Sequence, residues 1–73
     1  MGRPVKRSLT LKGHRTSVTL EDEFWQAFRS IAARRGRGLN DLAAEIDAAR
    51  DLETGLASAI RVFVLNDALA AER

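Results

Sequence analysis

The first fifteen residues of the chain concentrate positive charge. They hold no acidic side chain, whereas residues 16–73 carry seven basic and ten acidic side chains and so have a net charge of −3. Lysine and arginine side chains gathered at one end of a chain can bind phosphate groups of a polyanion. A solvated tail is the alternative explanation from charge alone. The five basic residues are Arg3, Lys6, Arg7, Lys12 and Arg15.

Polar and apolar residues alternate strictly in "RTSVTL", residues 15–20. Alternation over this length is typical of a β-strand with one face on a core and the other in solvent. A lone strand leaves backbone hydrogen-bonding groups without partners, and a short chain with few strands has few places to find them. We therefore expect a second strand to pair with residues 15–20.

The residue types that catalysis and metal binding require scarcely occur in this sequence. There is no cysteine, which excludes disulfides, thiolate metal sites and thiol nucleophiles, and His14 is the only histidine. No phosphate-binding glycine loop, Ser-His-Asp arrangement or metal-ligand spacing is present, and most acidic residues fall at expected helix ends. We expect no enzymatic activity, no cofactor and no metal site.

Three helices are predicted after the strand. Phe24, Phe28 and Ile31 follow the i, i+4, i+7 spacing of an amphipathic helix over residues 22–35, which begins with acidic residues and ends before Gly36. A second helix spans 40–50, with Asn40 as its N-cap. A third spans 56–71, because the high helix propensity of its two ends outweighs the β-branched residues near its middle. The remaining apolar residues of these helices that are expected to face the hydrophobic core are Leu42, Ile46, Ile60 and Phe63.

The expected organisation is a single domain over residues 15–73, preceded by a basic flexible arm over residues 1–14. A hairpin is the alternative, with an extra strand over 7–11 and a turn at Lys12 and Gly13, although Asn-Gly or Asp-Gly would be a stronger turn signal. A 73-residue chain without disulfides buries a small core, so self-association is the expected additional source of stability.

This order of strand, helix, glycine-containing turn and helix resembles the ribbon-helix-helix superfamily of bacterial DNA-binding proteins, which includes Arc and MetJ. The resemblance is carried by "GHRTSVTLEDEFW" and "GRGLNDLAAEI". More narrowly, "KRSLTLKGHRTSVTLEDEFWQAFRSIAARRG" together with "SAIRVFVLND" is similar to a short bacterial variant group with a third C-terminal helix. The resemblance covers residues 6–67.

The resemblance implies a mainly α fold with one short β-strand, in an intertwined homodimer whose two strands form an antiparallel ribbon between subunits. Thr16, Val18 and Leu20 would then face the helices of the dimer core. The opposite face of the ribbon would enter the DNA major groove and read base edges, with Arg15 on guanine and two hydroxyls that donate or accept. These base-reading residues are Arg15, Ser17 and Thr19. Trp25 would pack against the dimer mate or the third helix.

The start of the second helix is the implied phosphate site, since free N–H groups and the helix dipole favour an anion there. The matching residues are Gly38, Leu39 and Asn40, with Arg37 close by. Asp41 departs from the pattern, because a carboxylate at this position repels phosphate. Lys6, Arg7 and Lys12 would contact the DNA backbone from the arm.

The implied function is sequence-specific binding of double-stranded DNA by a homodimeric transcriptional regulator, a repressor in the bacterial cytoplasm. The longest run of large apolar residues is 62–65, so no association with a membrane is expected. Two alternatives remain open. One is an antitoxin, whose ribbon is joined to a toxin-binding tail. The other is a ribbon-helix-helix protein-interaction subunit that does not read an operator independently and binds a protein partner through its C-terminal helix.

Overall fold

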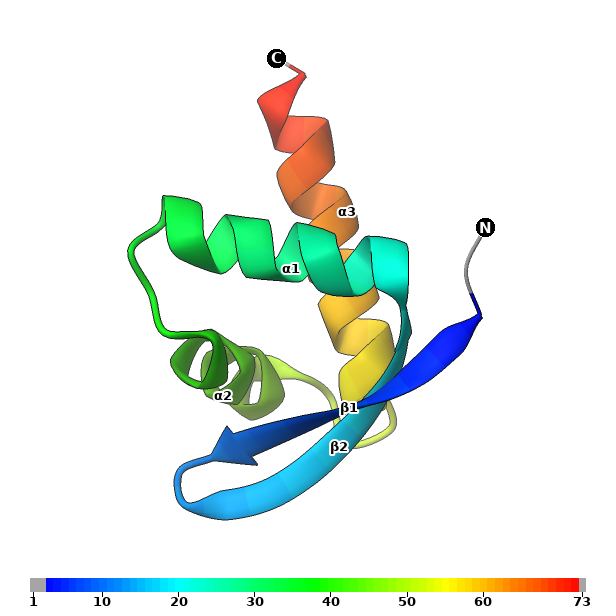
Figure 1. Cartoon of the computed structure of the whole chain (residues 1–73), viewed down its shortest axis with the longest axis vertical. Helices are drawn as coiled ribbons and strands as arrows, with labels where there is room; N and C mark the ends of the chain where they lie inside the picture. The colour runs from blue at the N-terminus through cyan, green and yellow to red at the C-terminus, as the bar shows by residue number, and fades with distance from the viewer. Residues whose placement is uncertain (1–2, 73) are drawn as a thin grey trace.

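The computed structural model describes residues 3–72, which form a two-stranded antiparallel sheet followed by three helices. The strands are β1 (Pro4–Leu11) and β2 (His14–Glu21), and together they are called the ribbon below. The helices are α1 (Asp22–Arg34), α2 (Leu39–Ala49) and α3 (Leu56–Ala71). The ribbon runs along one side of the molecule, and all three helices lie on the same side of the ribbon (Figure 1).

The ribbon is a hairpin within one chain, which corrects the expectation of a single strand behind a flexible arm. Lys12 and Gly13 have φ angles of 50° and 85°, the pair of positive values that a tight type I′ hairpin turn requires. The turn sets a register in which Leu11 faces His14 and Pro4 faces Glu21. Residues 4–11 are therefore a paired strand, while residues 1 and 2 of the expected arm lie outside the described residues.

The inner face of the ribbon closes the hydrophobic core. Leu9, Val18 and Leu20 alternate with polar residues along their strands and are 2%, 4% and 0% exposed. Thr16 lies on the same face, but it is exposed and lines an open hollow between the ribbon and α2. The expectation that Thr16 packs in the core therefore does not hold within a single chain.

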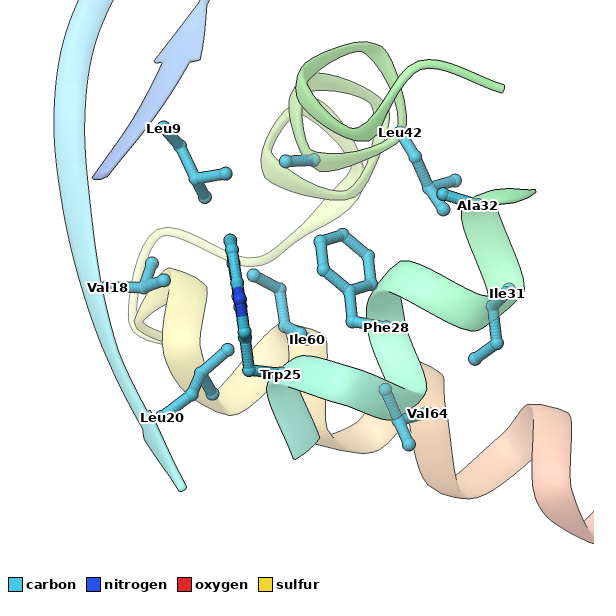
Figure 2. Packing of buried hydrophobic residues seen from close by; sticks show 11 residues of the cluster. Leu9, Val18, Leu20, Trp25, Phe28, Ile31, Ala32, Leu42, Ile60 and Val64 are labelled. Atoms are coloured by element: carbon cyan, nitrogen blue, oxygen red, sulfur yellow. The ribbon is translucent and has the colours of Figure 1, made fainter. Parts of the chain in front are cut away.

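Trp25 and Phe28 of α1 stand at the centre of the core. Their ring centroids are 6.5 Å apart, and Phe28 also meets the ring of Phe63 edge-on at 6.2 Å. Trp25 lies between the ribbon residues Leu9, Val18 and Leu20 and the core side chains from α1 and α3 (Figure 2). Its packing partners are thus the ribbon and helices of its own chain. The buried core also contains Ile31, Ala32, Leu42, Ala43, Ile60 and Val64, with Phe24 and Ile46 partly buried against it.

The helices begin at residues that leave their first N–H groups without side-chain caps. The N-caps of α1, α2 and α3 are Glu21, Gly38 and Gly55, and none makes a side-chain capping bond. The expectation that Asn40 caps the second helix is wrong, because α2 begins at Leu39 and Asn40 already lies inside its first turn. Between α1 and α2 the chain reverses at Gly36, whose φ of 66° a side chain would disfavour.

The expected order of a ribbon followed by two helices and an additional C-terminal helix is confirmed. Pairing of the ribbon between two subunits stays a prediction, because both strands of the described ribbon come from one chain. None of the helices in residues 3–72 is long and apolar enough to cross a bilayer.

The turn provides a direct test of the hairpin. A side chain at φ 50° is strained unless it is Asn, Asp or Gly, so Lys12→Asn should stabilise the chain by about 0.5–1 kcal/mol. Thermal unfolding measures this as an upward shift of Tm. The matched control is Lys12→Gln, which removes the same charge without the turn preference. An equal Tm for the two variants would contradict a left-handed residue at this position.

Candidate nucleic-acid interface

The outer face of the ribbon carries six polar side chains in three cross-strand rows. Lys6 pairs with Thr19, Ser8 with Ser17, and Thr10 with Arg15. All six side chains belong to exposed residues. The six consist of two cations and four hydroxyls. The fourth row of this face pairs Pro4 with Glu21, whose carboxylate is bound by Arg61. The hairpin thus forms from one chain the kind of polar surface that the sequence analysis expected two chains to share.

The spacing of these rows follows from the hairpin geometry. In a two-residue hairpin the pair next to the turn, Leu11 and His14, is hydrogen-bonded, so the outer-face pairs are the non-hydrogen-bonded ones, whose Cα atoms approach to about 4.5 Å. Thr10 agrees with this, since its backbone N–H points away from β2 and donates to Asn40. From Lys6 to Thr10 the face extends about 14 Å, at about 3.4 Å per strand residue.

The structure places the expected base-reading residues together. Arg15, Ser17 and Thr19 are exposed on one side of β2. Lys6, expected as part of an arm, lies on the same surface opposite Thr19. Ser8 and Thr10 complete the face and were missed by sequence analysis, although the alternation in "KRSLTL" was the signal that could have found them.

Arg7 does not lie with the other basic residues. It sits on the inner side of the ribbon opposite Val18, with an ion pair of 3.0 Å to Asp22 and its guanidinium 5.4 Å from the centre of the Trp25 ring. Its Nε is buried with no hydrogen-bond partner. Arg7 therefore fastens β1 to the start of α1, which corrects its expected role in binding phosphate.

The start of α2 lies beside the ribbon. The side-chain oxygen of Asn40 accepts a hydrogen bond of 3.1 Å from the backbone N–H of Thr10, so the helix start and β1 are joined directly. Leu39 turns its side chain partly into the core, while Gly38 and Arg37 are exposed. Two acidic residues also lie in this region, where a phosphate was expected to bind. Asp41 Oδ2 is 3.0 Å from where a side chain on Gly38 would begin, and Glu45 pairs with Arg37 at 2.9 Å.

A family model described as a ribbon-helix-helix domain matches residues 4–68, most of the chain. The chain belongs to the ribbon-helix-helix domain family. No curated protein and no solved structure shows significant similarity to it. The family is a non-enzymatic DNA-binding fold family. No group of three or more potential metal ligands occurs within residues 3–72.

In this ribbon-helix-helix chain, α3 is attached to the end of the ribbon through Arg61. Its Nε donates to a carboxylate oxygen of Glu21 at 3.0 Å, and its Nη2 donates to the backbone carbonyl of Thr19 at 3.1 Å. A hydrogen bond from the backbone N–H of Glu21 itself, and then the bond from Arg61, lower the pKa of the Glu21 carboxyl. The guanidinium also lies 5.9 Å from the centre of the Phe24 ring.

The other half of α3 is attached to the end of α1. Arg34 binds both carboxylate oxygens of Asp67 at 2.8 and 2.7 Å, and Arg35 binds Asp67 at 3.1 Å while it covers the Phe63 ring. Hydrogen bonds from Arg34 and then Arg35 lower the pKa of the Asp67 carboxyl. The two arginines are thus structural here. Neither this cluster nor the Arg61 cluster could be found from sequence, since each joins residues more than thirty positions apart.

These two carboxyls should make stability fall in acid. A carboxyl whose pKa is lower in the folded than in the unfolded chain stabilises the fold fully above its unfolded pKa, and that contribution is lost as the pH falls through the folded pKa. We therefore expect the free energy of unfolding, measured by urea titration, to decrease below about pH 5.

Asp67→Asn tests the assignment of this acid sensitivity. The variant should be less stable than the wild type at pH 7, and its stability should change less between pH 7 and pH 3, because one of the two shifted carboxyls is gone. Asp51→Asn, which removes an exposed carboxyl from the loop after α2, serves as the control. A pH dependence unchanged by Asp67→Asn would show that the cluster with Arg34 and Arg35 does not persist in solution.

Proposed function

We propose that this protein binds double-stranded DNA in a sequence-specific manner through the outer face of its ribbon and acts as a transcriptional repressor. The observation that carries the proposal is the outer face itself, where two cations and four hydroxyls project from a two-stranded ribbon and the one acidic residue of the face, Glu21, is paired with Arg61. Family membership supports DNA binding as the general function.

The dimensions of the ribbon suit the major groove of B-DNA. That groove is about 12 Å wide and admits a two-stranded β-ribbon. A face about 14 Å long spans about four base pairs at 3.4 Å per step. Because no helix covers this face, it can approach a duplex without rearrangement of the fold.

The side chains divide into reading and anchoring groups. Arg15 can donate two hydrogen bonds to the O6 and N7 atoms of guanine, and the hydroxyls of Ser17 and Thr19 can donate to or accept from base edges. Ser8 and Thr10 add two more short hydroxyls to the same surface. Short hydroxyls distinguish bases less strongly than bidentate side chains do, so Arg15 should supply most of the discrimination.

Phosphate contacts would come from both sides of this face. Lys6 lies at its open end, and Lys12 is exposed at the turn. The start of α2 is held beside β1 by the bond between Asn40 and Thr10, so the free N–H groups of the helix would be available to a phosphate of a docked duplex. Such contacts supply much of the affinity and make it depend on salt. A repressor bound in this way would act by excluding polymerase from its site.

Substitutions of Arg15 and Lys6 separate reading from anchoring. Arg15→Ala should weaken binding to the selected sequence by about 1–3 kcal/mol and change binding to random duplex much less. Lys6→Ala should weaken both by similar factors and reduce the slope of log K against log[salt] by about one. Fluorescence anisotropy at two or more salt concentrations, on duplexes selected from genomic fragments, measures both effects.

The control for both variants is Arg29→Ala, which removes one exposed positive charge from α1, a helix that lies on the opposite side of the ribbon from the outer face (Figure 1). Its affinity should stay close to that of the wild type. Equal losses for Arg15→Ala on selected and random duplexes would exclude base reading by Arg15. No binding of the wild type to any duplex at low salt would exclude the proposed function.

Neutralising Asp41 should strengthen DNA binding. The carboxylate lies beside Gly38 at the start of α2 and would repel a phosphate there, so Asp41→Asn should raise affinity for any duplex by a factor of about two to five. The same change should destabilise the fold by about 0.3–1 kcal/mol, because an acidic residue in the first turn favours the helix. Asp51→Asn is the matched control. An unchanged affinity would mean that no phosphate binds at the start of α2.

A further inference from the structure

Near the turn, the hydrophobic core supports the two strands of the ribbon unequally. On the inner face Leu9 of β1 is buried, but Thr16 opposite it is exposed and lines an open hollow of about 480 Å³ between the ribbon and α2. His14, at the start of β2, is exposed as well. The turn end of β2, which carries Arg15, is therefore positioned mainly by its pairing with β1 and not by packing of its own against a helix.

Asn40 holds the residue of β1 that lies opposite Arg15. Thr10 and Arg15 form the outer-face row next to the turn. The backbone N–H of Thr10 points away from β2 and donates to Asn40 Oδ1 at 3.1 Å, where the end of β1 comes next to α2 (Figure 1). A side chain of α2 thus fixes one member of the row, and the pairing between the strands transmits that position to the other member, Arg15.

The place of Asn40 in α2 is explained by the strand and not by the helix. An asparagine at the start of a helix ordinarily serves as the N-cap, but the N-cap of α2 is Gly38, which makes no side-chain capping bond. Asn40 stands two residues later, inside the helix, where asparagine is less favourable than alanine or glutamate. Its side chain therefore contributes to the structure through the bond to Thr10.

The backbone of Asn40 belongs to the proposed phosphate site. The first hydrogen bond within α2 runs from the N–H of Leu42 to the carbonyl of Gly38, so the N–H groups of residues 39–41 have no partner within the helix. These are the groups that favour an anion at the start of a helix. Asn40 thus contributes its backbone to the phosphate site and its side chain to the row that carries Arg15, and it sets the distance between the two.

We propose that Asn40 is a positioning residue that determines how strongly the ribbon discriminates between DNA sequences. With a phosphate bound at the start of α2, the bond to Thr10 holds Arg15 level with one base pair, so that its guanidinium meets the O6 and N7 atoms of guanine at that step only. Without the bond the row can shift relative to the phosphate, and Arg15 reaches neighbouring base pairs as well. Asn40 then sets specificity without touching a base. This inference rests on the DNA binding proposed above.

Fluorescence anisotropy on selected and random duplexes tests this role in the full chain. Asn40→Ala should lower the affinity for the selected duplex about fivefold and the affinity for random duplex by less than about twofold. Asn40→Asp keeps an acceptor oxygen for Thr10, so it should retain the wild-type ratio of the two affinities, although its charge weakens binding to both duplexes. The matched control is Asn66→Ala, at the other asparagine of the chain, which is exposed on α3 and should bind like the wild type.

The double variant Asn40→Ala with Arg15→Ala tests whether Asn40 acts through Arg15. Residues that act as one unit show non-additive effects. The ratio of the two affinities should therefore be the same for the double variant as for Arg15→Ala alone. A further fall in the ratio, as large as the one that Asn40→Ala causes in the wild-type background, would show that Asn40 acts independently of Arg15 and would contradict the proposal.

Amide hydrogen exchange of Thr10, measured by NMR without DNA, tests the bond itself. Exchange should be about fivefold faster in Asn40→Ala and close to the wild-type rate in Asn40→Asp. The fold should stay intact in both, because Asn40 is exposed and water can replace the lost bond. Equal Thr10 exchange in the wild type and Asn40→Ala, or unchanged discrimination by Asn40→Ala, would overturn the role of Asn40 and leave DNA binding by the ribbon standing. A wild type that binds no duplex would instead exclude the proposed function, and with it any role of Asn40 in reading DNA.

Discussion

The separation of the ribbon into a buried and a polar face depends on the register that the turn at Lys12 and Gly13 imposes. With that register Leu9 and Val18 lie in the core and Arg15 projects outward. Because side chains alternate along a strand, a slip of one residue would bring polar side chains of the slipped strand into the core and expose its apolar ones. The same pairing that completes a small core therefore also creates the surface for which we propose DNA binding.

Each of the three helices holds the ribbon by a contact that leaves its outer face free. Asp22 of α1 binds Arg7 from the inner side, Asn40 of α2 accepts the backbone N–H of Thr10, and Arg61 of α3 donates to the backbone carbonyl of Thr19. None of these contacts uses an outward side chain. The third helix thus contributes to the position of the ribbon as well as to the core, and its loss should disturb both.

The parts of this fold that sequence could predict are those set by short-range patterns. The spacing of Phe24, Phe28 and Ile31 indicates α1, and the alternation in residues 15–20 indicates β2 and its outward side chains. The sequence favours an arm over the hairpin because Lys is a poor residue for a left-handed turn position, but burial of Leu9 outweighs that local strain. The clusters around Arg61 and Asp67 depend on how distant segments pack, and no local pattern in the sequence specifies such pairs.

A ribbon made within one chain changes what a dimer would add to DNA recognition. The face of a single hairpin has no two-fold symmetry, since Lys6 lies at one end and Arg15 near the turn, so one chain would read an asymmetric stretch of about four base pairs. A ribbon shared between two chains would instead be symmetric about its own centre and would read one palindromic element. If the chains associate through a surface other than the ribbon, two separate ribbons would read two half-sites in inverted orientation, at a spacing fixed by that interface. The arrangement of sequences selected by the protein therefore reports which surface forms the dimer, because a half-site repeat with a spacer and a single continuous palindrome correspond to different interfaces.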